Sequence, residues 1–255
     1  MSLRIDLNAD VGEGMDADAE LFDVITSANI ACGGHVGDAD SMAHACEQAV
    51  GTHTVVGAHV SYPDPENFGR EVMDMSAVHL AAVITEQVLA LDAQAKAQGT
   101  GVMYVKPHGA LYHRIIEDVA HARAVVDAIH LLEQQLDRSL ALVCMPLSVA
   151  LVEAHDAGVR PVLEAFTDRA YTPDGRLVPR SDNGAVIDDP DAVEQQAVAL
   201  AMGSPIATSD DTRIVLSPES LCVHGDTPGA AILAQRVRTA LEARKVTIAP
   251  FVDPG

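Results

Sequence analysis

Tryptophan is absent from this 255-residue chain, and only 3% of its residues are aromatic. Apolar residues still make up 48% of the chain, so aliphatic side chains must fill its core. No segment approaches the roughly 18 consecutive apolar residues of a membrane-spanning helix. The N-terminal stretch MSLRIDLNAD also lacks the apolar region of a signal peptide. We therefore expect a cytoplasmic protein that does not bind membranes.

Positive charge is scarce as well. The chain has 16 lysines and arginines against 37 acidic residues, which gives a formal net charge of −21. Such a surface repels phosphate backbones, so nucleic acid is excluded as an expected partner. Only three lysines occur, Lys96, Lys106 and Lys245. A basic residue near a candidate site is therefore more informative here than in an average chain.

Several sequence motifs are also missing. The four cysteines form no C-x-x-C pair, which favours free thiols in a reducing compartment. No G-x-x-x-x-G-K-[ST] loop occurs, no G-x-G-x-x-G follows a strand, and no G-x-S-x-G elbow exists. These absences argue against a P-loop nucleotide site, a Rossmann dinucleotide site and a serine hydrolase of the nucleophile-elbow type.

Short apolar segments alternate with helical segments along the whole chain, which is typical of a mostly parallel sheet. We expect seven strands, over residues 3–8, 25–32, 53–60, 101–108, 140–146, 161–168 and 220–226. The expected helices cover residues 38–51, 76–99, 118–137, 147–157, 189–202 and 228–245. No linker interrupts residues 1–255, so the sequence predicts a single α/β domain. A closed or nearly closed barrel is favoured, with a doubly wound open sheet as the alternative.

Polar residues gather where these strands end. Four histidines lie at strand ends beside glycine or small residues: His35, His59, His108 and His224. Acidic residues occupy comparable positions: Asp6, Asp10, Glu13, Asp38, Glu164, Asp168 and Asp226. Both candidate architectures place functional residues at the carboxyl ends of strands. We therefore expect a shared polar site whose histidines could transfer protons, because imidazole titrates near neutral pH.

The first strand carries Asp6, Asn8 and Asp10 at every second position, so these side chains share one face. On a half-exposed strand this face would simply be the solvated one. In a barrel it points into the interior, where carboxylates are costly unless paired or bound to metal. Asp6, Asp10, His35 and His59 are thus candidate metal ligands. No compact spacing such as H-x-x-x-H supports a metal, so this question stays open at the sequence level.

The segment VKPHGALYH (105–113) places a rare lysine beside a histidine. Pro107 should end the strand, and Gly109 permits a sharp turn or a close approach of a ligand. Lys106 would then lie at the mouth of the site, where it could bind a carboxylate or phosphate or polarise a carbonyl; a surface lysine is the alternative. Arg70 and Arg169 are candidate anion-binding residues. Arg176 and Arg180 are interpreted as ordinary salt-bridge residues.

Six segments together resemble the LamB/YcsF family, which comprises the A components of 5-oxoprolinase. They are DLNADVGE, SANIACGGHVGD, GAHVSYPD with NFGRE, VKPHGALY, EAFTDRAYTPDGRLVPR and CVHGDTPGA. The resemblance runs from residue 5 to about residue 231. It implies a distorted seven-stranded (β/α) barrel related to glycoside hydrolase and polysaccharide deacetylase barrels. It further implies ATP-dependent opening of 5-oxo-L-proline to L-glutamate, together with subunits B and C.

This resemblance leads to a hypothesis for the roles of the residues. Lys106 and Arg70 would hold the carboxylate or phosphate, and His59 or His108 would move protons. Asp6, Asp10 and His35 would orient these groups or bind a divalent metal. The remaining expected substrate contacts are Asn8, Arg169 and His224.

Two alternatives belong to other functional classes. One is a metal-dependent amide hydrolase or polysaccharide deacetylase that acts without ATP. The other is a non-catalytic subunit that binds a lactam or sugar.

Overall fold

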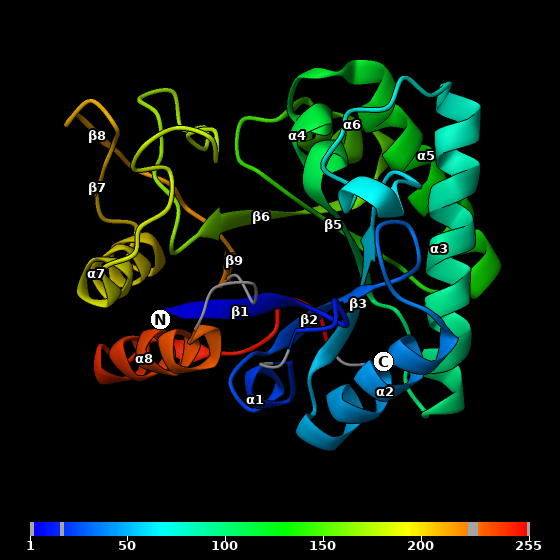
Figure 1. Ribbon diagram of the computed structural model, residues 1–255, viewed down its shortest axis with the longest axis horizontal. Coiled ribbons are helices and arrows are strands. Elements are labelled where there is room, and N and C mark those ends of the chain that lie inside the picture. The colour runs from blue at the N-terminus through cyan, green and yellow to red at the C-terminus, as the bar shows by residue number, and fades with distance from the viewer. Residues whose placement is uncertain (1–2, 16–17, 224–228, 254–255) are drawn as a thin grey trace.

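Seven parallel strands close into a barrel in the computed structural model, which describes residues 3–15, 18–223 and 229–253 (Figure 1). The strands follow the order β1-β2-β3-β4-β5-β6-β9, and β9 returns to pair with β1. Their bounds are β1 Arg4–Val11, β2 Ser27–Ala31, β3 Val55–Val60, β4 Tyr104–Pro107, β5 Ala141–Cys144, β6 Arg160–Phe166 and β9 Ser220–Cys222. The predicted barrel is thereby confirmed, and the open-sheet alternative is excluded.

The barrel is distorted by short and uneven strands. β4 and β5 share only two paired positions, and β9 has three residues. β10 (Thr247–Ile248) pairs with the start of β1, below the point where β9 begins. A separate antiparallel pair, β7 (Ile206–Ala207) and β8 (Arg213–Ile214), lies outside the ring. The sequence analysis did not predict β7, β8 or β10, each only two residues long.

Helices surround the barrel (Figure 1). They are α1 Asp18–Phe22, α2 Ala39–Thr52, α3 Ala77–Ala97, α4 Gly109–Glu117, α5 Val119–Leu136, α6 Val149–Ala157, α7 Pro190–Ala201 and α8 Ala230–Ala243, with a 3₁₀ turn over Pro65–Asn67. Because helices cover the outside and side chains fill the inside, every residue of β2 and β3 is buried. An aliphatic core joins the strands to α2, α3 and α5.

Local signals set the ends of the clearest helix. The Ser76 hydroxyl accepts a hydrogen bond from the His79 amide at the start of α3. Gly99, in the left-handed conformation with φ of +84°, follows its end. The sequence predicts both of these roles.

The helix expected over 118–137 is preceded by a second helix that sequence reasoning missed. Asp118 ends α4 and also caps α5, since its carboxylate accepts from the amides of Ala120 and His121. No described helix has the length and apolarity needed to cross a membrane. All four cysteines are buried and free.

Candidate active site at the carboxyl end of the barrel

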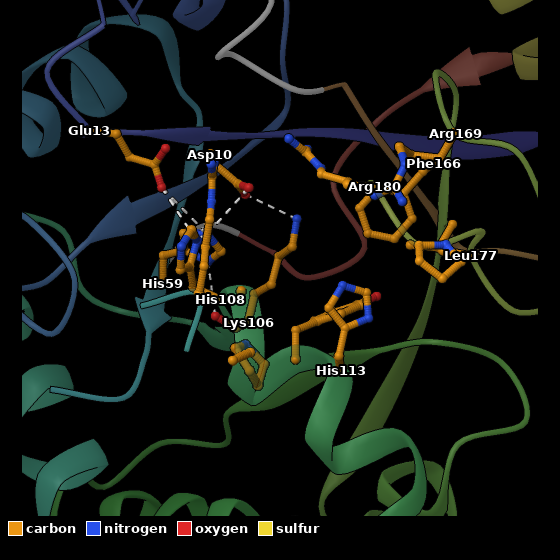
Figure 2. Close-up of a pocket in the computed structure, with 16 residues that line it drawn as sticks. Asp10, Glu13, His59, Lys106, His108, His113, Phe166, Arg169, Leu177 and Arg180 are labelled. Atoms are coloured by element: carbon orange, nitrogen blue, oxygen red, sulfur yellow. Dashed lines mark hydrogen bonds and ion pairs between the residues drawn. The ribbon is translucent and has the colours of Figure 1, made fainter. Parts of the chain in front are cut away.

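A cavity of about 460 Å³ opens at the carboxyl ends of the strands (Figure 2). Its walls come from β1, β3, β4, β6, α4 and the loops after β3 and β6. The lining includes seven of the residues expected at the strand ends: Asp10, Glu13, His59, Arg70, Lys106, His108 and Arg169. Residues far apart in the chain thus share one cavity, as the sequence predicts.

The alternating polar residues of β1 point into the barrel and form a hydrogen-bonded column. Asn8 donates to Glu164 and to the Ser220 hydroxyl, and its oxygen accepts from Asn29. Asn29 also donates to Asp10, the residue of this column nearest the carboxyl end of β1. The interior interpretation of this strand is therefore correct, because Asp6 and Asn8 are each 1% exposed.

Asp6 lies at the base of this column, apart from the cavity. Its carboxylate accepts from the hydroxyls of Thr26, Ser27 and Ser220. Burial raises the pKa of Asp6 to about 6, against the opposing effect of these hydrogen bonds. The structure does not bring Asp6 together with the histidines that the sequence analysis grouped with it as metal ligands.

Lys106 is a buried residue of the barrel interior and not a surface lysine. Only 2% of it is exposed, and its Nζ lies 3.0 Å from Asp10 Oδ1 and 2.9 Å from Glu164 Oε1. Nζ also donates to Asn8 Oδ1 at 3.1 Å. Burial by itself lowers the pKa of Lys106, but the facing charges, Asp10 foremost, outweigh it and hold the pKa well above its usual value.

Three imidazoles and one carboxylate converge beside Asp10. Nitrogens of His35, His59 and His108 and an oxygen of Glu13 all lie within 4.8 Å of one another. His59 Nε2 is 2.9 Å from His108 Nδ1, and His35 Nε2 is 2.9 Å from Glu13 Oε1. Of the four metal-ligand candidates from the sequence, His35 and His59 belong to this group. Asp10 borders it, 3.3 Å from His59 Nε2.

The outward-facing nitrogen of each ring is held by an oxygen. His59 Nδ1 donates to the Lys106 carbonyl at 3.1 Å, and His108 Nε2 donates to the Phe68 carbonyl at 2.9 Å. His35 Nδ1 lies 3.2 Å from the Ser61 hydroxyl, which itself donates to the Tyr62 carbonyl and so accepts from the ring. These bonds fix the tautomers, because an oxygen that can only accept requires a hydrogen on the ring nitrogen that faces it. The hydrogen is therefore on Nδ1 of His59 and His35 and on Nε2 of His108.

As a result, the inner nitrogens direct their lone pairs at one another and at Glu13. These lone pairs and the Glu13 carboxylate repel one another unless a positive charge lies between them. Burial lowers the pKa of His35 and His108 to about 3, with the neighbouring His59 adding to the effect, so both rings are neutral at pH 7. Burial also acts against protonated His59, but Asp10 and Glu13 outweigh it and raise its pKa. A proton on His59, or a metal cation, satisfies the group.

The arginines occupy different parts of the cavity. Arg70 is exposed and its guanidinium carbon lies 5.2 Å from the centre of the Phe68 ring. Arg169 is 3% exposed and donates to the carbonyls of Ala185 and Val178. Arg180, interpreted from the sequence as a salt-bridge residue, also lines the cavity.

Sequence reasoning passed over some residues of this site, and one predicted residue is not described. Tyr112, which donates to Glu164 Oε2 at 2.8 Å, and His113 both line the cavity from α4, a helix that the sequence did not predict. Glu13 was named only among the strand-end acids, and its place beside His35 depends on the loop after β1. His224 lies outside the described residues.

Comparison with known proteins agrees with this architecture. The A component of 5-oxoprolinase from Streptomyces avermitilis is 49% identical over 97% of this chain and 99% of its own length. The crystal structure of a lactam utilization protein from Thermus thermophilus superposes with a TM-score of 0.89 at 38% identity, covering 97% of this chain and all of that one. A CE4 family pseudoenzyme from Bacillus anthracis shares only the fold, at 10% identity and a TM-score of 0.50 over 98% of this chain and 64% of that one.

A model of the LamB/YcsF family also matches the chain, over residues 5–254, which reaches from β1 to β10. On these grounds the chain belongs to the LamB/YcsF family.

Proposed function

We propose that this chain is the A component of a cytoplasmic 5-oxoprolinase. Acting with subunits B and C and with hydrolysis of ATP, it opens the lactam of 5-oxo-L-proline to L-glutamate. The observation that carries this proposal is the 49% identity to the A component of a bacterial 5-oxoprolinase along nearly the full length of both chains. The polar cavity at the carboxyl end of the barrel supplies groups suited to this reaction.

The cavity suits a small lactam acid in size and polarity. Its volume of about 460 Å³ falls within the usual range for small-molecule sites. Phe166, Leu177 and Pro179 line it and offer apolar contacts to the ring methylenes. The imidazoles and carboxylates occupy one side, where the lactam carbonyl would lie (Figure 2).

Opening the ring requires that water add to the lactam carbon, that the C–N bond break and that nitrogen gain a proton. Asp10 is well placed to accept the proton from water, because Lys106 and Asn29 hold its Oδ1 while Oδ2 faces His59. When no metal occupies the neighbouring imidazole group, His59, whose pKa is raised, is suited to deliver a proton from Nε2 to the leaving nitrogen. His108 accepts at Nδ1 and keeps the His59 ring oriented.

The group of Glu13, His35, His59 and His108 also fits a divalent transition metal. Its donor set of three imidazoles and a carboxylate is typical of Zn²⁺ and related ions, and the outward N–H groups are bound as in known metal sites. Bound there, such a cation would act as a Lewis acid and lower the pKa of a coordinated water.

Metal content tests this part of the proposal without an activity assay. Wild-type protein dialysed against Zn²⁺ and then against buffer should retain about one equivalent by elemental analysis, and E13A and H108A should each lose it by roughly 10-fold or more. His44→Ala is the matched control, since the His44 side chain is 69% exposed on α2. Equal metal content in wild type and H108A would contradict the assignment.

The nucleotide site is a separate question. An amide is stabilised by resonance, so phosphorylation of its oxygen by ATP would make the carbon more electrophilic and the oxygen a leaving group. With no P-loop in the sequence, we assign ATP binding either to the partner subunits or to the loops at the strand ends. Calorimetric titration of the isolated chain with ATP distinguishes these two locations.

The decisive experiment measures glutamate formed from 5-oxoproline. The chain is assayed with ATP, with and without subunits B and C, next to K106A and H108A. We expect turnover only in the full mixture, and a loss of roughly 100-fold or more in H108A, because His108 orients His59, the residue that delivers the proton. Absence of glutamate in the full mixture, or full activity of both variants, would refute the proposal.

The metal-type group favours one second candidate, an amide hydrolase that acts without ATP. It predicts that metal-loaded chain alone cleaves N-acetyl sugars or simple amides. Assays of the isolated chain with and without ATP separate the two functions.

A further inference from the structure

Gln87 is a polar residue on the buried face of α3. Its neighbours on this face are fully buried aliphatic residues, Leu80, Ile84, Val88 and Leu91, and Gln87 itself is only 7% exposed. A buried carboxamide costs free energy unless its hydrogen bonds are made, and an aliphatic side chain at this position would avoid that cost. The hydrogen-bond partners of Gln87 therefore indicate what the residue contributes.

Both ends of the Gln87 carboxamide bind the backbone of one residue, Ser61. Gln87 Oε1 accepts from the Ser61 amide at 3.0 Å, and Nε2 donates to the Ser61 carbonyl at 2.8 Å. Ser61 follows Val60, the last residue of β3, so its backbone lies beyond the parallel pairing of the barrel. A buried backbone at such a position needs other hydrogen-bond partners. Gln87 supplies them and thereby holds the chain in place where β3 ends.

The Ser61 side chain connects Gln87 to the imidazole group, which consists of Glu13, His35, His59 and His108. The Ser61 hydroxyl donates to the Tyr62 carbonyl at 2.8 Å and accepts from His35 Nδ1 at 3.2 Å. With its hydrogen on Nδ1, the His35 ring directs Nε2 at Glu13 Oε1, which is 2.9 Å away. A continuous chain of contacts thus leads from α3 through Ser61 to a candidate metal ligand.

The loop after β2 packs closely against the same carboxamide. A Cβ on Gly34, the residue before His35, would lie only 2.5 Å from Gln87 Oε1. The Cys32 thiol lies 3.8 Å from that oxygen and donates to the His59 carbonyl at 3.4 Å. Gln87 therefore contacts both the segment that precedes His35 and the segment that follows His59.

We infer that Gln87 is a positioning residue of the candidate metal site. It fixes the Ser61 backbone, and the Ser61 hydroxyl then holds the His35 tautomer whose Nε2 lone pair faces the centre of the imidazole group. Gln87 touches neither substrate nor metal and acts through these neighbours alone. The inference rests on the proposed function for the identity of the ligand, a divalent transition metal, whereas the orientation of His35 follows from the contacts themselves.

Metal affinity of the full chain tests the inference without an activity assay. Gln87→Met removes both hydrogen bonds and keeps a similar volume, and Ser61→Ala removes the hydroxyl that holds His35. Titration with Co²⁺, followed by its visible absorption, should give a Kd about 10-fold higher for each variant, the usual effect of losing a partner of a ligating histidine. The double variant should lose less than the product of the two losses, because both changes act on one chain of contacts.

Asp92→Asn is the matched control. Asp92 is also buried on α3, but it accepts from the Val102 amide before β4 and from Arg138, at the end of the barrel opposite the cavity. D92N should lower stability and leave the Kd for Co²⁺ within about twofold of wild type. If Q87M does not fold, Gln87→Asn replaces it, since its carboxamide is one methylene too short to reach Ser61 and the same loss of affinity is expected.

A second measurement needs no metal. Long-range ¹H–¹⁵N spectra of metal-free protein report which ring nitrogen of each histidine carries the hydrogen. His35 should carry it on Nδ1 in wild type and in D92N. In Q87M and S61A the hydrogen should shift toward Nε2, from which it can be donated to Glu13.

Each other outcome has a defined meaning. A Kd of Q87M within about twofold of wild type, or an equal loss in D92N, overturns the inference. A loss in the double variant equal to the product also overturns it, because Gln87 would then act by a route other than Ser61. If wild type binds no Co²⁺ but the His35 tautomer changes in Q87M, the positioning role stands and the metal assignment of the proposed function fails. If wild type binds no Co²⁺ and the tautomer is unchanged in Q87M, both fail.

Discussion

At the scale of single residues, Lys106 is the clearest case of a side chain whose surroundings define its role. It is the one lysine of three that lies inside the barrel, and two carboxylates and an amide oxygen surround its ammonium. A buried charge of this kind is tolerated only because it is paired. Removing it would leave Asp10 and Glu164 facing each other without compensation.

Lys106→Met should therefore lower the free energy of unfolding by roughly 3–5 kcal/mol, the usual cost of breaking a buried pair. Lys96→Met is the control: the Lys96 side chain is 56% exposed, and its pair with Asp92 on α3 is worth about 0.3–0.5 kcal/mol. Urea unfolding followed by circular dichroism measures both. Similar losses in the two variants would show that Lys106 is not a buried structural ion.

Asp6 gives a prediction about pH. Its pKa is raised from 3.8 to about 6, so the folded state holds a proton that the unfolded state has released. The corresponding stability is fully present below pH 3.8 and is lost as pH rises through about 6. Between pH 4 and 7, wild type should lose about 2.4 kcal/mol of unfolding free energy relative to Asp6→Asn, at 1.36 kcal/mol per unit of pKa shift. If the urea midpoints of the two proteins change with pH in the same way across this range, the raised pKa of Asp6 is contradicted.

At the scale of elements, the turn from β4 into α4 positions the imidazole group. His108 is the first residue after β4, and its amide donates to the Val60 carbonyl on β3. Gly109 follows with φ of +53°, and a Cβ there would lie 2.5 Å from the Gly69 carbonyl oxygen. Glycine is thus required both by its conformation and by the close approach of the loop whose Phe68 carbonyl holds His108.

Gly109→Ala should accordingly lower the free energy of unfolding by more than its left-handed conformation alone explains. We expect a loss of about 2–4 kcal/mol, the sum of left-handed strain and overpacking, together with reduced metal binding. Gly99→Ala is the matched control, with φ of +84° and no atom within 4 Å of the added Cβ, so it should lose only about 1 kcal/mol. Equal losses of unfolding free energy in the two variants, measured by urea unfolding, would contradict a steric clash at Gly109.

At the scale of the whole molecule, the closed barrel and the excess of negative charge act together. Closure through β9 brings the ends of β1, β3, β4 and β6 around one cavity. The net charge of −21 opposes compaction by self-repulsion. The positive charge of Lys106 inside the barrel therefore has a structural role.

Screening should relieve this repulsion. Raising NaCl from about 10 to 300 mM shortens the Debye length severalfold, and we expect stability to rise by about 1 kcal/mol, or about 2–4 °C in Tm. Thermal unfolding in a low-salt series measures the effect, with an osmotically matched sucrose series as the control. A Tm that falls with salt would mean that attractive surface pairs outweigh the net repulsion.

The local patterns of the chain predicted the alternating strands and helices of an α/β fold and favoured a barrel, with an open sheet as the alternative. Alternation along residues 6–10 predicted an inward polar face, and capping residues such as Ser76 and Gly99 marked a helix correctly. Strand alternation and helix capping depend on residues that are close in sequence, so they can be predicted from a single sequence. The short strands β7, β8 and β10 were not predicted because pairing with distant residues, and not local periodicity, holds them in place. The helix α4 has an amphipathic pattern, with Leu111, Tyr112 and Ile115 buried, which sequence reasoning passed over.

Only the tertiary structure decided which of these residues act together. It joined Glu13 and His108 to His35 and His59, and it left Asp6 at the base of the barrel. It also paired Lys106 with Glu164 and hydrogen-bonded Arg169 to the Val178 carbonyl. The partners in each case are separated by many residues along the chain, and ring tautomers depend on carbonyls of other strands and loops. Such choices are set by barrel closure and by the direction of each side chain, which residue spacing does not encode.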